Sequence, residues 1–539
     1  MTESPHAIDT KPAKIGKSLP IEHPRGSESL KDLPVIQART QSIGLLTFIL
    51  IVGALLRFYQ IGTESYWIDE MYTVVEGQQS VSQLLQSGRL DQPPAYYLPF
   101  RIWIQLFSAS EVSTRSFSAI IGLVCVAFVY WIGKELFSTE AGLLSAFLMA
   151  ISEFQIMYSQ QARYYTFFEL MTILSFLFLI LALRRQKKLY AWFYVLSSVL
   201  MIYSHAFGVF ILAAQNLYFL LQFKNYRHLL VPWLIGQALI VLGVIPYFYP
   251  LFLGSGVVEE AISNTAPAPP PKLWQPLNSI YRFIMPLRFE QSWATIFGNY
   301  FAAFLFLGVS VIVYAWFQGW RKWFAAVQDW IRGLSAPEAR SRESVLMICW
   351  LAIPLLLPFI MSWVVVPIFN HRYNIGAAPA LYLLLALFLL QIRKIVPVML
   401  SLGALIILIV PGLNHYYETD INQQWRETTQ YVAENAAMSN TVVFPPHRDV
   451  GLKSKMMEWY TQETLLSCGL NMQRPDIEIW SSLRQCTSEQ DRFWVVYFTD
   501  EPVSSPVEPF FLGPDQTQLR LLEKRQFVEI TVYLFEWME

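Results

Sequence analysis

Apolar stretches that approach the length needed to cross a lipid bilayer recur along most of this chain. They lie near residues 42–60, 116–133, 141–158, 166–183, 190–204, 206–223, 229–253, 295–317, 345–367, 376–391 and 395–413. A helix needs about 20 apolar residues to cross roughly 30 Å of hydrocarbon. Hydrophobic residues make up 54% of the 539 residues and charged residues only 15%, which is too apolar for a soluble protein of this length. We therefore predict a mostly α, polytopic membrane protein with about eleven transmembrane helices.

Basic residues gather in alternate connections between these stretches. The polar tail before the first span contains Lys11, Lys14, Lys17, Arg25, Lys31 and Arg39, and further Lys and Arg residues cluster near 184–188, 224–227, 321–342 and 393–394. The positive-inside rule places such segments in the cytoplasm. The first span ends at Arg57 without a small-residue cleavage signal, which favours an anchor over a signal peptide. An odd number of spans then places the C-terminus outside.

This topology divides the chain into a disordered cytoplasmic tail at 1–41, a transmembrane body at 42–413 with a large outer loop at 61–113, and an extracytoplasmic segment at 414–539. In that last segment, a helical run from Gln423 and strand-like runs at 441–444, 493–498 and 527–535 predict a small α/β domain. Cys468 and Cys486 both lie there, where a disulfide is permitted. The alternative is two buried thiols.

Two adjacent acids, Asp69 and Glu70, come shortly after the first span. An acid held at a membrane face is a functional candidate because charge there is costly; the alternative is that both simply lie in water. The apolar spacing over Thr63–Gln86, after the capping-type residues Thr63 and Ser65, predicts an amphipathic helix on the membrane surface. Neighbours on a helix point about 100° apart. Only one of the two acids should therefore act on a given substrate atom.

The predicted topology brings further polar residues to the same membrane face. They are Asp91, Tyr96, Arg163, Tyr164, His205, His371, Arg372 and Tyr373. A carboxylate can deprotonate an attacking hydroxyl, and an arginine can bind a phosphate bidentately and stabilise the charge that develops as it leaves. A second carboxylate with a histidine could hold a divalent ion. Such a face suits a reaction on an anionic, lipid-linked substrate.

At these residues the chain resembles the bacterial polytopic glycosyltransferases with the C-type fold, a group that includes protein O-mannosyltransferases and the lipid A aminoarabinose transferase. The resemblance rests on the Asp69-Glu70 pair, the segment from Asp91 to Tyr97 with its two prolines, the pattern from Ser159 to Tyr165, His205, and Arg372-Tyr373. It covers residues 45–225 and, more loosely, 365–450. The chain departs from the family at Gln161, where Glu is common, and at Gln92, where a basic residue or His is common.

The resemblance implies a role for each of these residues. Asp69 and Glu70 would be the catalytic residues: Asp69 would be the base of a single inverting displacement on a polyprenyl-phosphate sugar, and Glu70 would support the loop or bind the acceptor. The donor phosphate would be bound by Arg163, Arg372, Tyr164 and Tyr373. The remaining implied roles are metal contacts for Asp91 and His205 and acceptor or donor contacts for His371 and Tyr96. No cofactor is firmly implied, although a divalent cation such as Mg or Mn is allowed.

We therefore predict a glycosyltransferase of the bacterial inner membrane that moves a hexosyl or pentosyl group from a polyprenyl-phosphate donor to a lipid, glycan or protein acceptor. A net charge of −1 argues against a nucleic-acid partner. The runner-up is a secondary transporter or lipid flippase, which should carry polar residues at mid-membrane and repeated halves. A scaffold that presents the C-terminal domain is a third alternative, and the absence of a P-loop motif argues against an ATP-driven pump.

Overall fold

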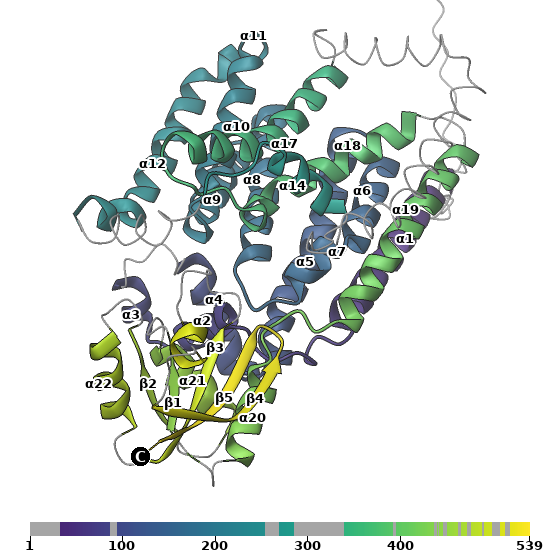
Figure 1. Ribbon diagram of the computed structural model, residues 1–539. Coiled ribbons are helices and arrows are strands. Elements are labelled where there is room, and N and C mark those ends of the chain that lie inside the picture. The colour runs from purple at the N-terminus through teal and green to yellow at the C-terminus, as the bar shows by residue number, and fades with distance from the viewer. Residues whose placement is uncertain are drawn as a thin grey trace, which may run out of the picture. The chain divides into compact units, whose positions relative to one another are not determined.

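The structure is a computed structural model in which residues 33–86, 94–253, 269–284, 339–391 and 395–435 are described (Figure 1). Further described residues are 439, 441–445, 450–461, 465–471, 476–487, 490–498, 507–512 and 518–538. The first 32 residues, the predicted span at 295–317 and Asp91 lie outside the described residues. Helix α1 (Leu33–Phe58) begins inside the segment predicted as a disordered tail, so the helix starts earlier than expected.

The membrane part consists of long apolar helices. After α1 they are α5 (Glu111–Leu136), the pair α6 (Thr139–Ile151) and α7 (Glu153–Ser159), α8 (Tyr165–Arg185), α9 (Lys188–Ser204), α10 (Gly208–Leu221), α12 (Leu230–Leu253), α17 (Ala339–Val364), α18 (Ala378–Gln391) and α19 (Ile395–Glu418). In the described residues, seven helices are long and apolar enough to cross a membrane, or eight if the bent pair forms one span. Apart from 295–317, every predicted span coincides with a helix or a helix pair.

Helices α5 and α6 approach closely because glycines meet at their contact. A Cβ atom added at Gly133 would lie 2.6 Å from the Cα atom of Gly142, and one added at Gly142 would lie 2.4 Å from the carbonyl oxygen of Tyr130. Small residues allow such close backbone approach between membrane helices, where van der Waals packing drives association. A larger side chain at either glycine would force the two helices apart.

The break between α6 and α7 positions part of the site. The two helices meet at an angle of 63°, and the Ser152 side chain caps α7 by accepting from the Gln155 N–H group. The fully buried Arg57 donates to the carbonyl oxygens of Met149 (3.2 Å) and Ala150 (2.8 Å), which a broken helix leaves without internal partners. Arg57 also donates to Ser159 Oγ at 3.1 Å. This network fixes the turn that follows α7.

The outer loop folds into short helices. They are α2 (Ile68–Gly77), α3 (Val81–Gln86) and α4 (Pro94–Phe107). The prediction of one helix over Thr63–Gln86 is wrong. The first helix begins only at Ile68, and a break after Gly77 separates it from α3. Ser65 does not cap a helix, because its hydroxyl donates instead to the carbonyl oxygen of Gln423, 358 residues further along the chain.

A segment after α12 also packs against the membrane helices. Helix α14 (Gln275–Ile284) contacts α7, α17, α18 and the 3-10 helix η2 (His371–Ala377). The carbonyl oxygen of Phe283 accepts from Ser152 Oγ (2.9 Å) and from the Tyr382 hydroxyl (2.8 Å). These contacts hold α14 beside the broken α6–α7 pair.

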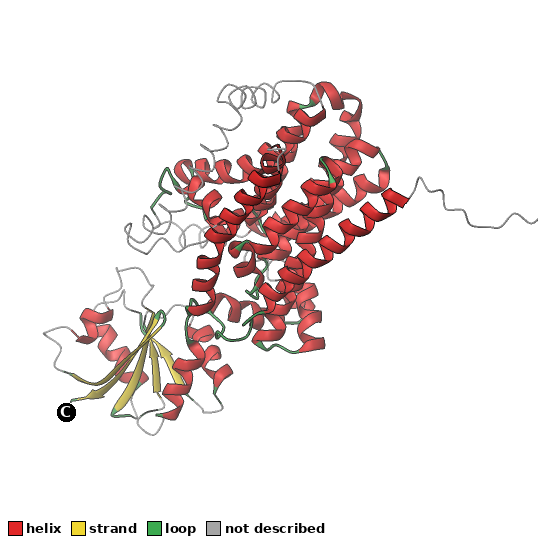
Figure 2. Ribbon diagram, turned by 90° about the vertical axis from the view of Figure 1, so that its right-hand side faces the viewer, coloured by secondary structure: helices red, strands yellow, loops and turns green. Residues whose placement is uncertain are grey.

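The C-terminal part forms one mixed sheet of five strands, in the order β2-β1-β3-β5-β4. The strands are yellow in Figure 2. The strands are β1 (Thr441–Phe444), β2 (Leu466–Gly469), β3 (Arg492–Phe498), β4 (Leu519–Phe527) and β5 (Ile530–Trp537), and the helices are α20 (Trp425–Glu434), α21 (Val450–Tyr460), α22 (Asp476–Cys486) and α23 (Val507–Leu512). Strand β1 pairs in parallel with β2 and β3, whereas β3, β5 and β4 pair antiparallel. The sheet confirms the predicted α/β domain.

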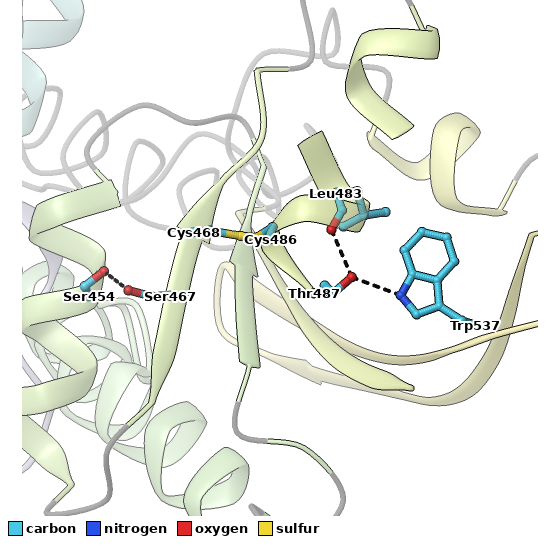
Figure 3. The surroundings of a disulfide bond; sticks show 7 residues. All are labelled: Ser454, Ser467, Cys468, Leu483, Cys486, Thr487 and Trp537. Atoms are coloured by element: carbon cyan, nitrogen blue, oxygen red, sulfur yellow. Dashed lines mark hydrogen bonds between the residues drawn. A yellow bond between two sulfur atoms is a disulfide. The ribbon is translucent and has the colours of Figure 1, made fainter. Parts of the chain in front are cut away.

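Strands β1, β3 and β5 are buried on both faces of the sheet, whereas the edge strands β2 and β4 are more exposed. Neighbouring residues on a strand point to opposite sides of a sheet. On β3, Trp494 and Val496 belong to the main hydrophobic core, whereas Phe493 and Val495 belong to a second, smaller core. Figure 3 shows the predicted pair Cys468 and Cys486 joined in a disulfide, with Cα atoms 6.2 Å apart. The bond links β2 to the last residue of α22.

Candidate active site

The Asp69 carboxylate lies between two arginines from distant parts of the chain. Its Oδ2 atom is 3.8 Å from Arg163 Nη2 and 3.6 Å from Arg372 Nη1. The Asp69 side chain is 32% exposed, so it is neither sequestered nor fully in water. Its distances to the guanidinium nitrogens exceed those of charge-assisted hydrogen bonds, which are about 2.7 to 2.9 Å. The carboxylate therefore keeps room for another partner.

Arg163 is held rigidly on one side of this carboxylate. Its Nη1 atom donates to the Asp69 carbonyl oxygen and to Thr73 Oγ1, both at 2.9 Å, and its guanidinium lies 4.7 Å from the centre of the Tyr164 ring. Burial opposes its charge, but Asp69 and the nearby tyrosines outweigh burial and raise the pKa of Arg163 well above its usual value. Arg163 is therefore a permanent, fixed cation.

Arg372 approaches from η2 on the other side. The Asn370 side chain caps η2 by accepting from the Arg372 N–H group at 3.2 Å, and the Arg372 guanidinium lies 5.2 Å from the centre of the Tyr373 ring. In the part of the chain that the structure describes, Nε of Arg163 and Nε of Arg372 are buried and have no hydrogen-bond partner. Both arginines thus retain donor capacity that an anion could use.

Glu70 has the opposite environment, although it is the next residue on α2. Its carboxylate is fully buried and accepts from Arg115 Nε at 2.9 Å and Arg115 Nη2 at 2.7 Å. It also accepts from the Ala162 N–H group at 2.8 Å. Glu70 therefore ties α2 to α5 and to the turn that carries Arg163. Its predicted part in catalysis, loop support or acceptor binding stays a prediction.

Aromatic rings fill the space around the two arginines. The His205 ring lies 5.4 Å from the Tyr164 ring and 4.7 Å from the Tyr373 ring, so it stands between the two tyrosines that stack on Arg163 and Arg372. Tyr96 is fully buried, and its ring lies 6.3 Å from that of Tyr164. Tyr96 is thus part of the packing around the site and presents no exposed surface to a substrate.

The contacts of His205 argue against its predicted role as a metal ligand. Its Nδ1 atom accepts from the Phe207 N–H group at 3.0 Å, so a neutral ring carries its proton on Nε2 and offers no free lone pair there. Burial, followed by Arg372 and Arg163, lowers the pKa of His205 to about 3. The described residues contain no group of three His, Cys, Asp or Glu side chains that could hold a metal. Asp91, the other predicted ligand, lies outside them.

His371 lies at the rim of the site and contacts α14. Arg282 Nη1 donates to His371 Nε2 at 2.9 Å, which places the proton of a neutral ring on Nδ1. Helix α14 thus reaches the residue beside Arg372. Whether His371 contacts a substrate stays a prediction.

A polar cavity of about 40 Å³ lies beside Arg115, the partner of Glu70. Its lining includes Glu64, Arg115, Gln161, Tyr416 and Asp420. Arg115 forms part of its wall and holds Glu70 at the same time. Burial raises the pKa of Glu64, whose Oε1 atom accepts from the Ile421 N–H group.

Comparison with known proteins agrees with this architecture. Residues 91–249 match the family described as dolichyl-phosphate-mannose-protein mannosyltransferase. The fold is similar to that of ArnT from Cupriavidus metallidurans bound to undecaprenyl phosphate, with a TM-score of 0.53 and 11% identity over 91% of this chain and 98% of that one. The apo form of that ArnT gives a TM-score of 0.52 and 12% identity, with 92% and 98% covered.

An oligosaccharyltransferase from Archaeoglobus fulgidus, in complex with Zn and sulfate, is similar too. Its TM-score is 0.51 and its identity 14%, over 84% of this chain and 68% of that one. No curated protein matches the chain in sequence. The chain has the C-type glycosyltransferase fold. The expected resemblance is thus confirmed at the level of the fold, and with it the polytopic membrane architecture.

Within this C-type fold, sequence reasoning missed the residues that hold the site together. Arg115 pairs with Glu70, Thr73 orients Arg163, and Arg282 contacts His371. Arg115 offered a signal, since an arginine close to the start of an apolar span stands out. The pattern was not decisive, because arginines near span ends commonly snorkel to the interface. Thr73 and Arg282 offered no such signal.

Proposed function

We propose that this protein transfers a sugar from a polyprenyl-phosphate donor to an acceptor by an inverting single displacement, with Asp69 as the general base. The observation that carries the proposal is the partly exposed Asp69 carboxylate flanked by Arg163 and Arg372. A base and two phosphate-binding cations at one point are what such a displacement needs. The match to a mannosyltransferase family and the similarity to ArnT bound to undecaprenyl phosphate support this donor class.

The proposed reaction forms one bond and breaks one. The acceptor oxygen attacks the anomeric carbon while Asp69 takes the proton from that oxygen. The bond between the anomeric carbon and the phosphate oxygen breaks, and its electron pair stays on the phosphate. Attack from the face opposite the phosphate inverts the configuration. The products are the glycosylated acceptor and the polyprenyl phosphate.

Arg163 and Arg372 would stabilise the phosphate as its charge increases. Without donor, both arginines are partly neutralised by Asp69 at 3.6 to 3.8 Å, and the Nε donors of each remain unfilled within the described residues. A bound phosphate would use these donors and loosen the hold on Asp69. Donor binding would therefore free the base for the acceptor.

The remaining assignments follow from the predicted topology. The protein would lie in the bacterial inner membrane with its N-terminus in the cytoplasm, and the C-terminal domain would lie outside. The acceptor, a lipid, glycan or protein, would enter from that outer side. The fully buried Glu70 would act as a positioning residue through its pair with Arg115.

The test compares purified wild-type protein with Asp69→Asn on a panel of radiolabelled polyprenyl-phosphate sugars, with membrane extract as the acceptor source. We expect wild type to release polyprenyl phosphate from at least one donor and Asp69→Asn to release almost none. A matched control is Glu458→Gln, which removes an exposed carboxylate from helix α21 and should retain activity.

Each other outcome has a distinct meaning. Equal activity of wild type and Asp69→Asn would move the base to another acid, such as Asp91. No release by wild type from any donor would overturn the enzyme proposal and favour the transporter. Transfer with retained anomeric configuration would contradict the single displacement.

A further inference from the structure

The helix that carries Asp69 does not cap its own N-terminus. The first N–H groups of an α-helix have no partner within the helix and are usually satisfied by a Ser, Thr, Asp or Asn side chain at the cap position. Here the cap residue is Trp67, and, within the described residues, its side chain makes no capping hydrogen bond. Asp69 is the second residue of α2, so it lies in the turn that an unsatisfied end would leave free to fray.

Gln423, far away in the sequence, takes the place of this cap. Its Oε1 atom accepts from the N–H group of Ile68, the first residue of α2, at 3.2 Å. The same oxygen accepts from Trp425 Nε1 at 3.1 Å, and the Gln423 carbonyl oxygen accepts from Ser65 Oγ at 2.9 Å. Trp425 is fully buried, which fixes the position of the Gln423 side chain.

Neighbouring contacts fasten the segment that leads into α2. Arg426 donates to the Thr63 carbonyl oxygen at 3.0 Å and to Glu111 Oε1 at 2.7 Å. The Tyr460 hydroxyl accepts from the Tyr66 N–H group at 2.8 Å and donates to Glu111 Oε1 at 2.9 Å. These residues hold the chain before α2, whereas Gln423 contacts the helix end itself.

We propose that Gln423 is a positioning residue that holds the first turn of α2, and with it the Asp69 carboxylate, in the geometry needed for proton abstraction. The inference rests on the proposed function, because it assigns Asp69 as the base. It gives the C-terminal segment a part in the reaction: the segment completes the helix from which the base acts. A shift of about 1 Å in a reacting group can cost roughly 100-fold in rate.

The test compares Gln423→Ala, Gln423→Glu and Gln424→Ala. Gln423→Ala removes the acceptor, so kcat should fall about 10- to 100-fold while the KM for the donor changes much less, because only the base is displaced. Gln423→Glu keeps an acceptor oxygen near Ile68 and should recover most of the lost kcat. Gln424→Ala is the matched control, since Gln424 contacts Asp420 and Val528 rather than α2, and it should behave as wild type.

Hydrogen exchange of the α2 amides provides a readout that does not depend on activity. In Gln423→Ala the amides of the first turn should exchange faster, with no change in the helices of the membrane part. If the α2 amides exchange faster in Gln423→Ala but the wild-type protein transfers no sugar, the cap is confirmed and the proposed function is overturned. Unchanged exchange and kcat in Gln423→Ala would overturn the inference. A loss equal in Gln423→Ala and Gln424→Ala would also overturn it, because damage to the C-terminal domain would then explain both.

Discussion

The two sides of helix α2 carry the same chemical group in opposite environments. Asp69 is 32% exposed, and its Oδ2 atom lies 3.6 Å from Arg372 Nη1 and 3.8 Å from Arg163 Nη2. Glu70, one residue later, is fully buried and accepts three hydrogen bonds between 2.7 and 2.9 Å. A saturated carboxylate has no capacity to accept a further proton from a substrate without losing these partners. A loosely held carboxylate has that capacity.

This contrast indicates that the two adjacent acids have different roles because their environments differ. The pair of Glu70 with Arg115 is buried, and such pairs fix geometry more than they add stability. Asp69 depends on that geometry, because Glu70 also binds the Ala162 N–H group beside Arg163. One acid therefore builds the site in which the other would act. The predictions below separate the two roles.

The largest expected effect is on the rate of Asp69→Asn. The substitution keeps the shape but removes the base, so kcat should fall about 100- to 10,000-fold. The thermal midpoint should stay close to that of wild type, because the ion pairs of the partly exposed Asp69 with Arg163 and Arg372 are long, at 3.8 and 3.6 Å. Single-turnover assays and thermal unfolding in detergent measure the two quantities. A large drop in stability would mean that Asp69 supports the fold in the same way as Glu70.

Glu70→Gln should act on stability. It leaves the buried Arg115 guanidinium without its counter-charge, and breaking such a pair costs about 3 to 5 kcal/mol in the free energy of unfolding. The double variant Glu70→Gln with Arg115→Gln should lose less than the sum of the two single variants. Chemical or thermal unfolding monitored by tryptophan fluorescence measures this coupling. If Glu70→Gln were as stable as wild type, the proposed difference in role between Glu70 and Asp69 would be wrong.

Arg372→Gln should weaken donor binding with little effect on the fold. Hydrogen bonds to a charged group contribute about 1.5 to 3 kcal/mol, so the affinity for a polyprenyl phosphate should fall roughly 10- to 100-fold. Arg185→Gln, at the end of α8, is the control because its partner is Glu135. Equilibrium binding of labelled polyprenyl phosphate measures the change. Unchanged binding would remove Arg372 from the phosphate site.

The smallest expected effect concerns pH and His205. The pKa of His205 is lowered from 6.5 to about 3 by burial and by the two arginines. Between these values the unfolded chain binds more protons than the folded protein, so the free energy of unfolding should decrease as the pH falls below about 6.5. His205→Phe should make this decrease shallower. Thermal midpoints at pH 5 and pH 8 test it, and identical slopes in both proteins would contradict it.

Parts of the fold follow directly from the sequence. The apolar stretches predict the helices because hydrocarbon requires length and hydrophobicity, and those are local properties. Strands β1 and β3 also match their predicted ranges, since their β-branched and aromatic residues are buried on both faces. Strand β4 was not foreseen, because its burial pattern is mostly exposed and its charged residues gave no clear alternation.

Hydrophobicity and motifs were enough to predict a polytopic membrane helix bundle with an α/β domain and to make Asp69, Arg163 and Arg372 candidates for one site. Tertiary structure decided that Asp69 lies between the two arginines, that Glu70 is bound by Arg115, and that Gln423 caps α2. The physical reason is the range of the interactions. Periodicity and hydrophobicity act between neighbours, whereas these contacts join residues up to 355 positions apart, and only folding brings such residues together.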